Sequence, residues 1–281
     1  MSSQGEDVCT TITARKLLRQ RIEAGGFILA PGVHDGFSAR IALETGAGVT
    51  ASVHGCADLG IATLNDMRRS AEMIASLSPF TPVIADADTG YGGPIMVART
   101  VEQYSRSGVG ALHIEDQVQT KRCGHLAGKV LVDLKEYLAR IRAAVQARRR
   151  IESDIVIIAR TDSIQKHGYE EALAGSVLHA MLELMLLSLR VFVLLNMVEN
   201  SVTPKISAKE AKGLGFSMMI VPLATLAPAY TAIKAGLQKL KETGLADTEL
   251  TPQDLFRVCG LDESMKIDEE AGASNFEGGV D

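Results

Sequence analysis

One stretch of the sequence places a cysteine between a basic pair and a histidine, inside a loop that also contains two glycines. Neighbouring cations lower the pKa of a thiol, which can then exchange protons near neutral pH. The glycines allow the loop to bend and to close over a site. The alternative is a surface loop whose cysteine has no role. We favour a catalytic group made of Cys123, Lys121, Arg122 and His125.

Three carboxylates follow two neighbouring apolar segments. Asp86 and Asp88 come after residues 83–85, and Glu115 ends the segment 111–115. Side chains two positions apart in an extended chain share one face, so Asp86 and Asp88 can reach one ion. Three carboxylates with water suit Mg²⁺, with Mn²⁺ as a second candidate. The alternative is that Asp88 merely begins a turn.

Other polar groups suit an anionic substrate. Arg160 follows an apolar segment and could bind a carboxylate through two hydrogen bonds, or could form a surface ion pair with Asp162. The backbone N–H groups of 45–48 could hold a second carboxylate, or form a plain loop. Asn196 could bind substrate or cap a sheet end. His113, inside an apolar strand, is expected to be buried and hydrogen-bonded.

These groups lie in a sequence in which short strands alternate with amphipathic helices. This alternation is typical of parallel α/β folds. We expect strands at 27–30, 83–85, 111–115, 155–159, 194–197 and 218–221, and helices at 14–23, 38–44, 66–76, 94–105, 134–148, 208–213 and 228–241. Asn65 can cap the helix expected at 66–76. Strand after strand ends in a polar group, as at the active-site face of a (β/α)₈ TIM-type barrel. A doubly wound sheet is the alternative, but no GxGxxG turn follows the first strand.

Two places are short for eight βα units. Almost no apolar strand separates the helix ending near Glu44 from the glycine-rich segment 45–48. Between Glu170 and Met197 the chain accommodates one apolar helix, at 172–187, running into one strand. We therefore expect the barrel to be truncated around strands 2 and 6, which would leave strand edges unpaired.

Composition sets the class of protein. The 281 residues suit a single domain spanning 1–281, with loose tails at 1–12 and 271–281. A net charge of −5 argues against nucleic-acid and anionic-membrane partners. Four scattered cysteines suggest neither a disulfide framework nor a zinc site and favour a reducing compartment. The polar start lacks a secretory h-region, and 181–198 is too short and charged to span a membrane, so we expect a cytoplasmic protein.

With these residues assembled, the chain resembles the isocitrate lyase/phosphoenolpyruvate mutase superfamily over residues 14–281. The matching motifs include Asp86-Ala87-Asp88-Thr89-Gly90-Tyr91-Gly92, His113-Ile114-Glu115-Asp116-Gln117, Lys121-Arg122-Cys123-Gly124-His125, Ala159-Arg160-Thr161-Asp162 and Asn196-Met197-Val198-Glu199. The resemblance implies a TIM-type barrel, a Mg²⁺ site and a mobile loop carrying the cysteine. It also implies a homotetramer, a dimer of dimers, whose C-terminal helices swap between subunits.

The resemblance also implies roles for individual residues. Cys123 matches the general acid. The metal and metal-water positions are Asp86, Asp88 and Glu115. The positions that bind the small carboxylate substrate are Thr45, Gly46, Ala47, Asp58, Arg160 and Asn196. The family carries a glutamate on its sixth strand, and the short segment between Glu170 and Met197 lacks the part of the chain where that glutamate would lie.

Three functions follow from the resemblance. A cysteine in this loop is typical of the family's carbon–carbon lyases, of the 2,3-dimethylmalate and 2-methylisocitrate type. Pro222 also resembles the lyases, whereas serine is expected there in the oxaloacetate hydrolases, which are the second possibility. The third is an inactive, truncated member that assembles with full-length relatives. Phosphorus chemistry is disfavoured by the cysteine loop.

Overall fold

Short aliphatic segments pair into one parallel sheet. The computed structural model describes residues 13–43, 47–49, 55–124, 126–163, 192–201 and 204–273. Within these ranges seven strands pair in the order β5-β4-β3-β2-β1-β7-β6. The strands are β1 (Ile28–Val33), β2 (Ala47–Val49), β3 (Val83–Asp86), β4 (Ala111–Glu115), β5 (Val156–Arg160), β6 (Leu194–Asn196) and β7 (Met218–Val221).

Six of the nine helices in the described residues begin where a polar side chain caps the first turn. Thr13, Asp35, Thr63, Asp133, Ser207 and Thr251 each accept a hydrogen bond from a backbone N–H of the helix that follows. The helices are α1 (Ala14–Glu23), α2 (Gly36–Ile41), α3 (Leu64–Ser76), α4 (Pro94–Arg106), α5 (Leu134–Arg150), α9 (Ala208–Gly213), α10 (Leu226–Thr243), α11 (Pro252–Val258) and α12 (Leu261–Glu270).

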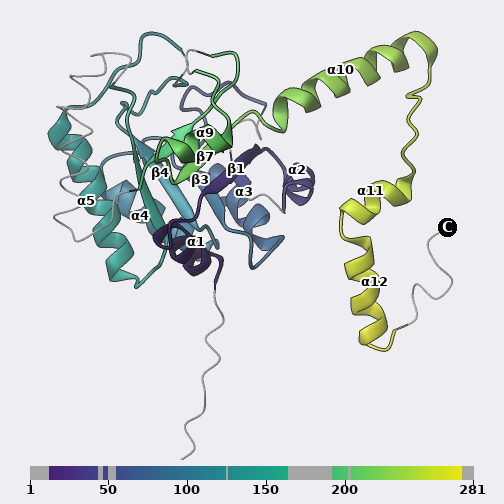
Figure 1. The fold of residues 1–281 in the computed structure, drawn as a ribbon, viewed down its shortest axis with the longest axis horizontal. Helices are drawn as coiled ribbons and strands as arrows, with labels where there is room; N and C mark the ends of the chain where they lie inside the picture. The colour runs from purple at the N-terminus through teal and green to yellow at the C-terminus, as the bar shows by residue number, and fades with distance from the viewer. Residues whose placement is uncertain are drawn as a thin grey trace, which may run out of the picture.

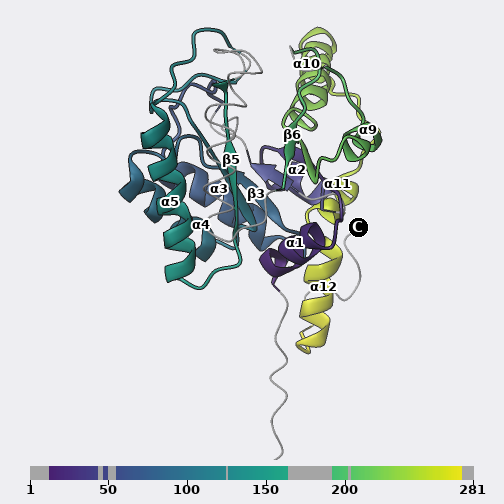
Figure 2. The same cartoon turned by 60° about the vertical axis from the view of Figure 1, so that its left-hand side comes forward.

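The two faces of the sheet have different neighbours. Alternate residues such as Val83, Ala85 and Leu112 pack beneath the helices α3, α4 and α5, which lie along one side of the sheet (Figure 2). Their neighbours Ile84 and Ala111 face the other way and join a second cluster with residues of α1. Because side chains alternate along a strand, the second face also carries the polar residues that end β3, β4, β5 and β6.

The sheet corrects one expectation about the short places. The second strand is present as β2, three residues long, and pairs with β1 and β3. Three residues suffice because both neighbours supply ladder partners. The other short place, including the helix expected at 172–187, lies within 164–191, outside the described residues. The tail 1–12 lies outside them too.

Most element boundaries lie within a few residues of those expected from the sequence. The first strand, expected at 27–30, spans Ile28–Val33, and the helix expected at 228–241 spans Leu226–Thr243. Helices 14–23 and 208–213 and strands 111–115 and 218–221 are confirmed to the residue. The helix expected at 38–44 begins at Gly36 because Asp35 and Ser38 form a capping box. The helix expected to start at 66, capped by Asn65, instead begins at Leu64, because Thr63 and Asp66 form the capping box.

The last three helices form an arm that leaves the sheet. α10 projects from the main body (Figure 1). The chain then turns downward in this view and continues through α11 and α12. None of the described residues of α10 or α12 is buried. Arg40 of α2 lies 3.6 Å from Glu263 of α12, where the arm meets the body. Among the described helices, none has both the length and the apolar character that a membrane span requires.

Candidate active site

Polar side chains gather where the strands end, on the same face of the sheet. The strand register sets Asp86 beside His113 and Glu115 beside Arg160. Side chains directly opposite one another on neighbouring strands come into contact. His113 Nδ1 therefore lies 3.4 Å from Asp86 Oδ1, and Arg160 Nη1 lies 3.2 Å from Glu115 Oε2.

Asp86 is held by its surroundings as an ionised group. Burial opposes its charge, but His113, Lys121 and Arg160 outweigh that effect and lower the pKa of Asp86 to about 2. Its Oδ1 accepts a hydrogen bond of 2.8 Å from the backbone N–H of Asp88. Its backbone carbonyl accepts a 2.8 Å hydrogen bond from the hydroxyl of Tyr104. Asp86 is therefore fixed both at its side chain and at its backbone.

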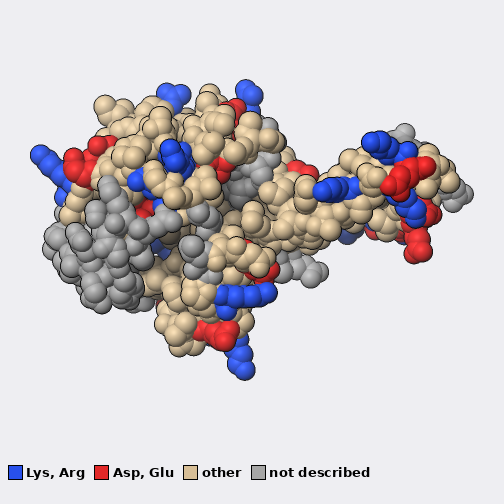
Figure 3. Space-filling model, turned by 90° about the horizontal axis from the view of Figure 1, so that it is seen from above, with Lys and Arg blue, Asp and Glu red and all other residues tan. Residues whose placement is uncertain are grey.

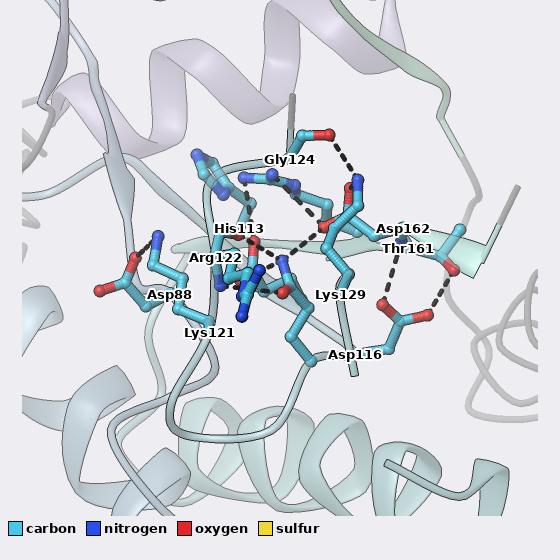
Figure 4. Close-up of polar contacts among 12 residues, drawn as sticks. Asp88, His113, Asp116, Lys121, Arg122, Gly124, Lys129, Thr161 and Asp162 are labelled. Carbon is cyan, nitrogen blue, oxygen red and sulfur yellow. Dashed lines mark hydrogen bonds and ion pairs between the residues drawn. The ribbon is translucent and has the colours of Figure 1, made fainter. Parts of the chain in front are cut away.

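Asp88 is neutralised by a buried lysine. Lys121 is only 1% exposed, and its Nζ forms ion pairs with both Asp88 and Asp58. Burial and the nearby charge of Asp86 raise the pKa of Asp88 to about 7. The carboxylates outweigh burial at Lys121 and raise its pKa, so the ammonium stays charged. Lys121, expected to assist Cys123, thus lies among the carboxylates (Figure 4).

Glu115 is the second buried carboxylate with a raised pKa. Its side chain is 1% exposed, and burial raises its pKa to about 8 despite the nearby Arg160. Gln117 Nε2 donates a 3.1 Å hydrogen bond to Glu115 Oε1. Arg160 also lies 3.5 Å from Asp162. The ion pair considered from sequence does form, but it is largely buried and shares the arginine with Glu115.

The cysteine loop lies directly over this group. Cys123 is a half-buried thiol. A methyl group added at Gly124 would come within 2.7 Å of Arg160 Nη2, so the backbone of the loop passes directly beside the Arg160 guanidinium. The side chain of Arg122 donates to the backbone carbonyl of Ala127 at 3.2 Å, within the loop. His125 lies outside the described residues.

The carboxylates fit the divalent ion that the resemblance implies. Among the described residues, no three Asp, Glu, His or Cys side chains lie close enough to form a cation cage by themselves. Mg²⁺ usually keeps several waters and takes only one or two carboxylates directly. Asp88 and Glu115 are nevertheless buried with raised pKa values, which a nearby cation would lower. The donor set therefore fits a partly hydrated ion.

The structure describes only some of the other residues that were expected to bind substrate. Asn196 ends β6, and its buried Oδ1 has no hydrogen-bond partner in the described part of the chain. A buried acceptor of this kind is available to a ligand. Ala47 begins β2, whereas Thr45 and Gly46 lie outside the described residues. Asp58 joins the group through its ion pair with Lys121.

Several polar residues of the site were not given a role from sequence. Gln117 is fully buried and contacts both Glu115 and Asp162. Lys129 Nζ lies 3.0 Å from Asp162 Oδ1. Asp116 accepts hydrogen bonds from Thr161 and from the backbone N–H of Asp162 (Figure 4). The available signal was that Gln117 and Asp162 stand two positions after the strand-end residues Glu115 and Arg160.

Both the sequence and the fold are similar to those of known proteins. A family model described as phosphoenolpyruvate phosphomutase matches residues 18–180. The chain is 31% identical to 2,3-dimethylmalate lyase of Eubacterium barkeri, over 91% of this chain and 97% of that protein.

Two solved structures are also similar over nearly the whole chain. The first is 2,3-dimethylmalate lyase, described as a PEP mutase/isocitrate lyase superfamily member. It matches with a TM-score of 0.88 and 58% identity, over 96% of this chain and 99% of that one. The second is oxaloacetate acetylhydrolase in complex with the inhibitor 3,3-difluorooxalacetate. It matches with a TM-score of 0.88 and 48% identity, over 94% and 99% of the two chains.

Proposed function

Because the chain belongs to the PEP mutase/isocitrate lyase superfamily and is homologous to its carbon–carbon lyases, we propose that it is a Mg²⁺-dependent lyase. Its substrate is a substituted 2-hydroxy di- or tricarboxylate of the 2,3-dimethylmalate or 2-methylisocitrate type. The products are pyruvate or a similar 2-keto acid and a carboxylic acid. The observation that carries the proposal is the approach of the Cys123 loop to Arg160, beside three strand-end carboxylates.

The fold proposed for this function is a TIM-type barrel in one domain. The order of the seven described strands follows the chain from β1 to β5 on one side and from β7 to β6 on the other. This order is what a closed barrel requires. In the proposed barrel, β5 and β6 flank the position that the sequence predicts to be truncated.

Asp86, Asp88 and Glu115 are proposed to hold Mg²⁺, directly or through water, with Mn²⁺ as a substitute. When bound, the ion polarises the hydroxyl and carboxylate oxygens of the substrate. Asp86 is the residue best prepared to ligate it, because its pKa is lowered to about 2 while the other two carboxylates have raised pKa values.

The substrate is held by groups around the ion site. Arg160 offers its guanidinium to a carboxylate, and Asn196 offers an amide. The backbone of Thr45, Gly46 and Ala47 is proposed to bind a carboxylate, and Asp58 to face the substrate beside Lys121. The ammonium of Lys121 limits the negative charge that the substrate meets.

The reaction is a retro-aldol cleavage. The hydroxyl proton passes to a carboxylate of the site, and the electron pair it leaves forms the keto group of one product as the carbon–carbon bond breaks. The electron pair of that bond stays on the second fragment as a carboxylate-stabilised carbanion. The Cys123 thiol then donates its proton to this carbon. A closed loop keeps out water that would compete as the proton donor.

Hydrolysis of oxaloacetate to oxalate and acetate is the second candidate. The 48% identity to oxaloacetate acetylhydrolase favours it. Pro222, which resembles the lyases, speaks against it. Its carbonyl lies so close to Gly32 that a methyl group there would clash, which places Pro222 beside the end of β1. The inactive, truncated subunit is the non-enzymatic alternative.

The assembly proposed is a homotetramer, a dimer of dimers joined by the arm. Apolar side chains of α10 are well exposed, among them Tyr230, Ile233, Leu237 and Leu240. They are spaced three and four residues apart and so form one face of the helix. A second copy of the chain is proposed to cover this face by exchange of the C-terminal helices.

The test measures product release in the presence of Mg²⁺. Purified protein is incubated with 2,3-dimethylmalate, 2-methylisocitrate or oxaloacetate, and 2-keto acid and oxalate are quantified separately. Keto-acid release from a hydroxy acid is the expected result, and oxalate release alone would establish the hydrolase instead. Cys123→Ser should abolish turnover and leave substrate binding intact, because serine at this position is far too weak an acid. Unchanged turnover in that variant would refute the role of Cys123.

A further inference from the structure

We propose that Gln117 and Lys129 are positioning residues, which hold the backbone on both sides of Cys123 and thereby fix its thiol over the strand ends. The inference deepens the proposed function and rests on the role given there to Cys123. It concerns two side chains that do not themselves face the reacting atoms.

Gln117 holds the residue before the cysteine. Its Oε1 accepts the backbone N–H of Arg122 at 3.1 Å, and its Nε2 donates to the backbone carbonyl of Arg122 at 2.8 Å. The amide thus pairs with both backbone groups of one residue, as a neighbouring strand would. Gln117 is fully buried, and Arg140 donates a 2.9 Å hydrogen bond to its backbone carbonyl. Its own position is therefore fixed.

Lys129 holds the residue after the cysteine. Its Nζ donates to the backbone carbonyl of Gly124 and lies 3.0 Å from Asp162 Oδ1. The Lys129 side chain is only 4% exposed. A buried ammonium must keep its partners, because an unpaired charge there is costly. The loop is therefore held where Gly124 and Asp162 can both reach Lys129.

Both residues are tied to the strand ends. Gln117 Nε2 also lies 3.1 Å from Glu115 Oε1 and 3.0 Å from Asp162 Oδ2, while Asp162 contacts Arg160. Two nitrogen-bound protons are shared among three acceptors, so movement of Glu115 or Asp162 changes the hold on Arg122. Figure 4 shows Lys129, Gly124 and Asp162 meeting over the end of β5. The position of the cysteine is thereby coupled to the carboxylate-binding groups.

The experiment measures how fast the Cys123 thiol reacts. In a background where Cys9, Cys56 and Cys259 are serine, alkylation of Cys123 by iodoacetamide is followed by mass spectrometry. Lys129→Met and Gln117→Leu should each raise the rate about tenfold or more, because each removes hydrogen bonds that keep the loop closed. Gly124→Ala should also raise the alkylation rate, because its methyl group would displace the end of the Arg160 side chain that lies beside the loop.

Gly124→Ala keeps the test decisive if a buried substitution prevents folding, because it changes a half-buried residue and leaves the side chains of Gln117 and Lys129 in place. Lys135→Met, an exposed lysine on α5, is the matched control and should leave the rate unchanged. Folded variants that alkylate at the parent rate would overturn the proposal, and a lowered melting temperature alone would assign Lys129 a structural role only. Because no substrate is used, a chain without lyase activity would leave this result interpretable.

Discussion

The carboxylates of the site are paired with two largely buried cations, Lys121 and Arg160. Asp58, Asp88 and Lys121 form one group, in which a single ammonium meets two carboxylates. Glu115, Asp162 and Arg160 form another, centred on a guanidinium. The two buried carboxylates, Asp88 and Glu115, keep raised pKa values even beside these cations. Both pKa values would fall if a cation bound beside these carboxylates, as the proposed function requires.

Removing the central ammonium should weaken the fold. Lys121→Met leaves Asp88 buried without its counter-ion, and breaking a buried pair in this way costs about 3 kcal/mol. Urea unfolding should report a loss of that order, and adding Asp88→Asn should restore most of it. Arg68→Met, at the exposed pair with Glu72, is the control and should cost less than about 1 kcal/mol. Equal losses at the two sites would contradict the account.

Strand-end residues were predictable, and loop contacts were not. Asp86, Glu115 and Arg160 lie together as expected, because the ends of parallel strands meet on one face. The extended geometry expected for Asp86 and Asp88 is not found, since β3 ends at Asp86 and Asp88 has a φ of +47°. The position of Lys121 was missed because its partners, Asp58 and Asp88, come from loops whose path no local pattern fixes. Gln117 and Lys129 were missed for the same reason, since the sheet and the folded loop bring them together.

At the scale of elements, capping and pairing decided what the sequence left open. Asn65 looked like a helix cap, but Thr63 takes this role because Asp66 completes a capping box with it. Residues 47–49 lacked a strand pattern, yet they form β2 because two neighbouring strands offer hydrogen-bond partners. Helices α11 and α12 were not located individually, because their apolar residues remain exposed and form only a weak pattern.

The arm gives an element-scale prediction. Leu237→Glu places a charge on the apolar face of α10, which the proposed partner subunit covers, so light scattering should report a smaller assembly than for the parent protein. Ala235→Glu, on the opposite face of the same helix, is the control and should leave the mass unchanged. An unchanged mass in Leu237→Glu would show that this face does not join the subunits.

In the whole molecule, the sheet gathers the residues of the candidate site and the arm projects from the main body. The sheet brings side chains from β3, β4, β5 and β6 to one edge, although they are far apart in the sequence. The arm projects away from the main body (Figure 3). The part of the arm next to the body shows few charged side chains, and Lys, Arg, Asp and Glu gather at the end of the arm farthest from the body. Strand order followed from the βα alternation, whereas no sequence pattern predicted the direction of the arm, whose helices α10 and α12 have no buried residues.

The most direct test of the central claim is thermal melting of the intact protein with and without Mg²⁺ plus oxalate, a mimic of an enolate product. Ligands that bind only the folded state raise the melting temperature, and saturating binding should raise it by about 5 °C or more. Asp86→Asn should lose most of this rise, since it removes the ionised carboxylate. A melting temperature that does not change with Mg²⁺ and oxalate would contradict an assembled lyase site.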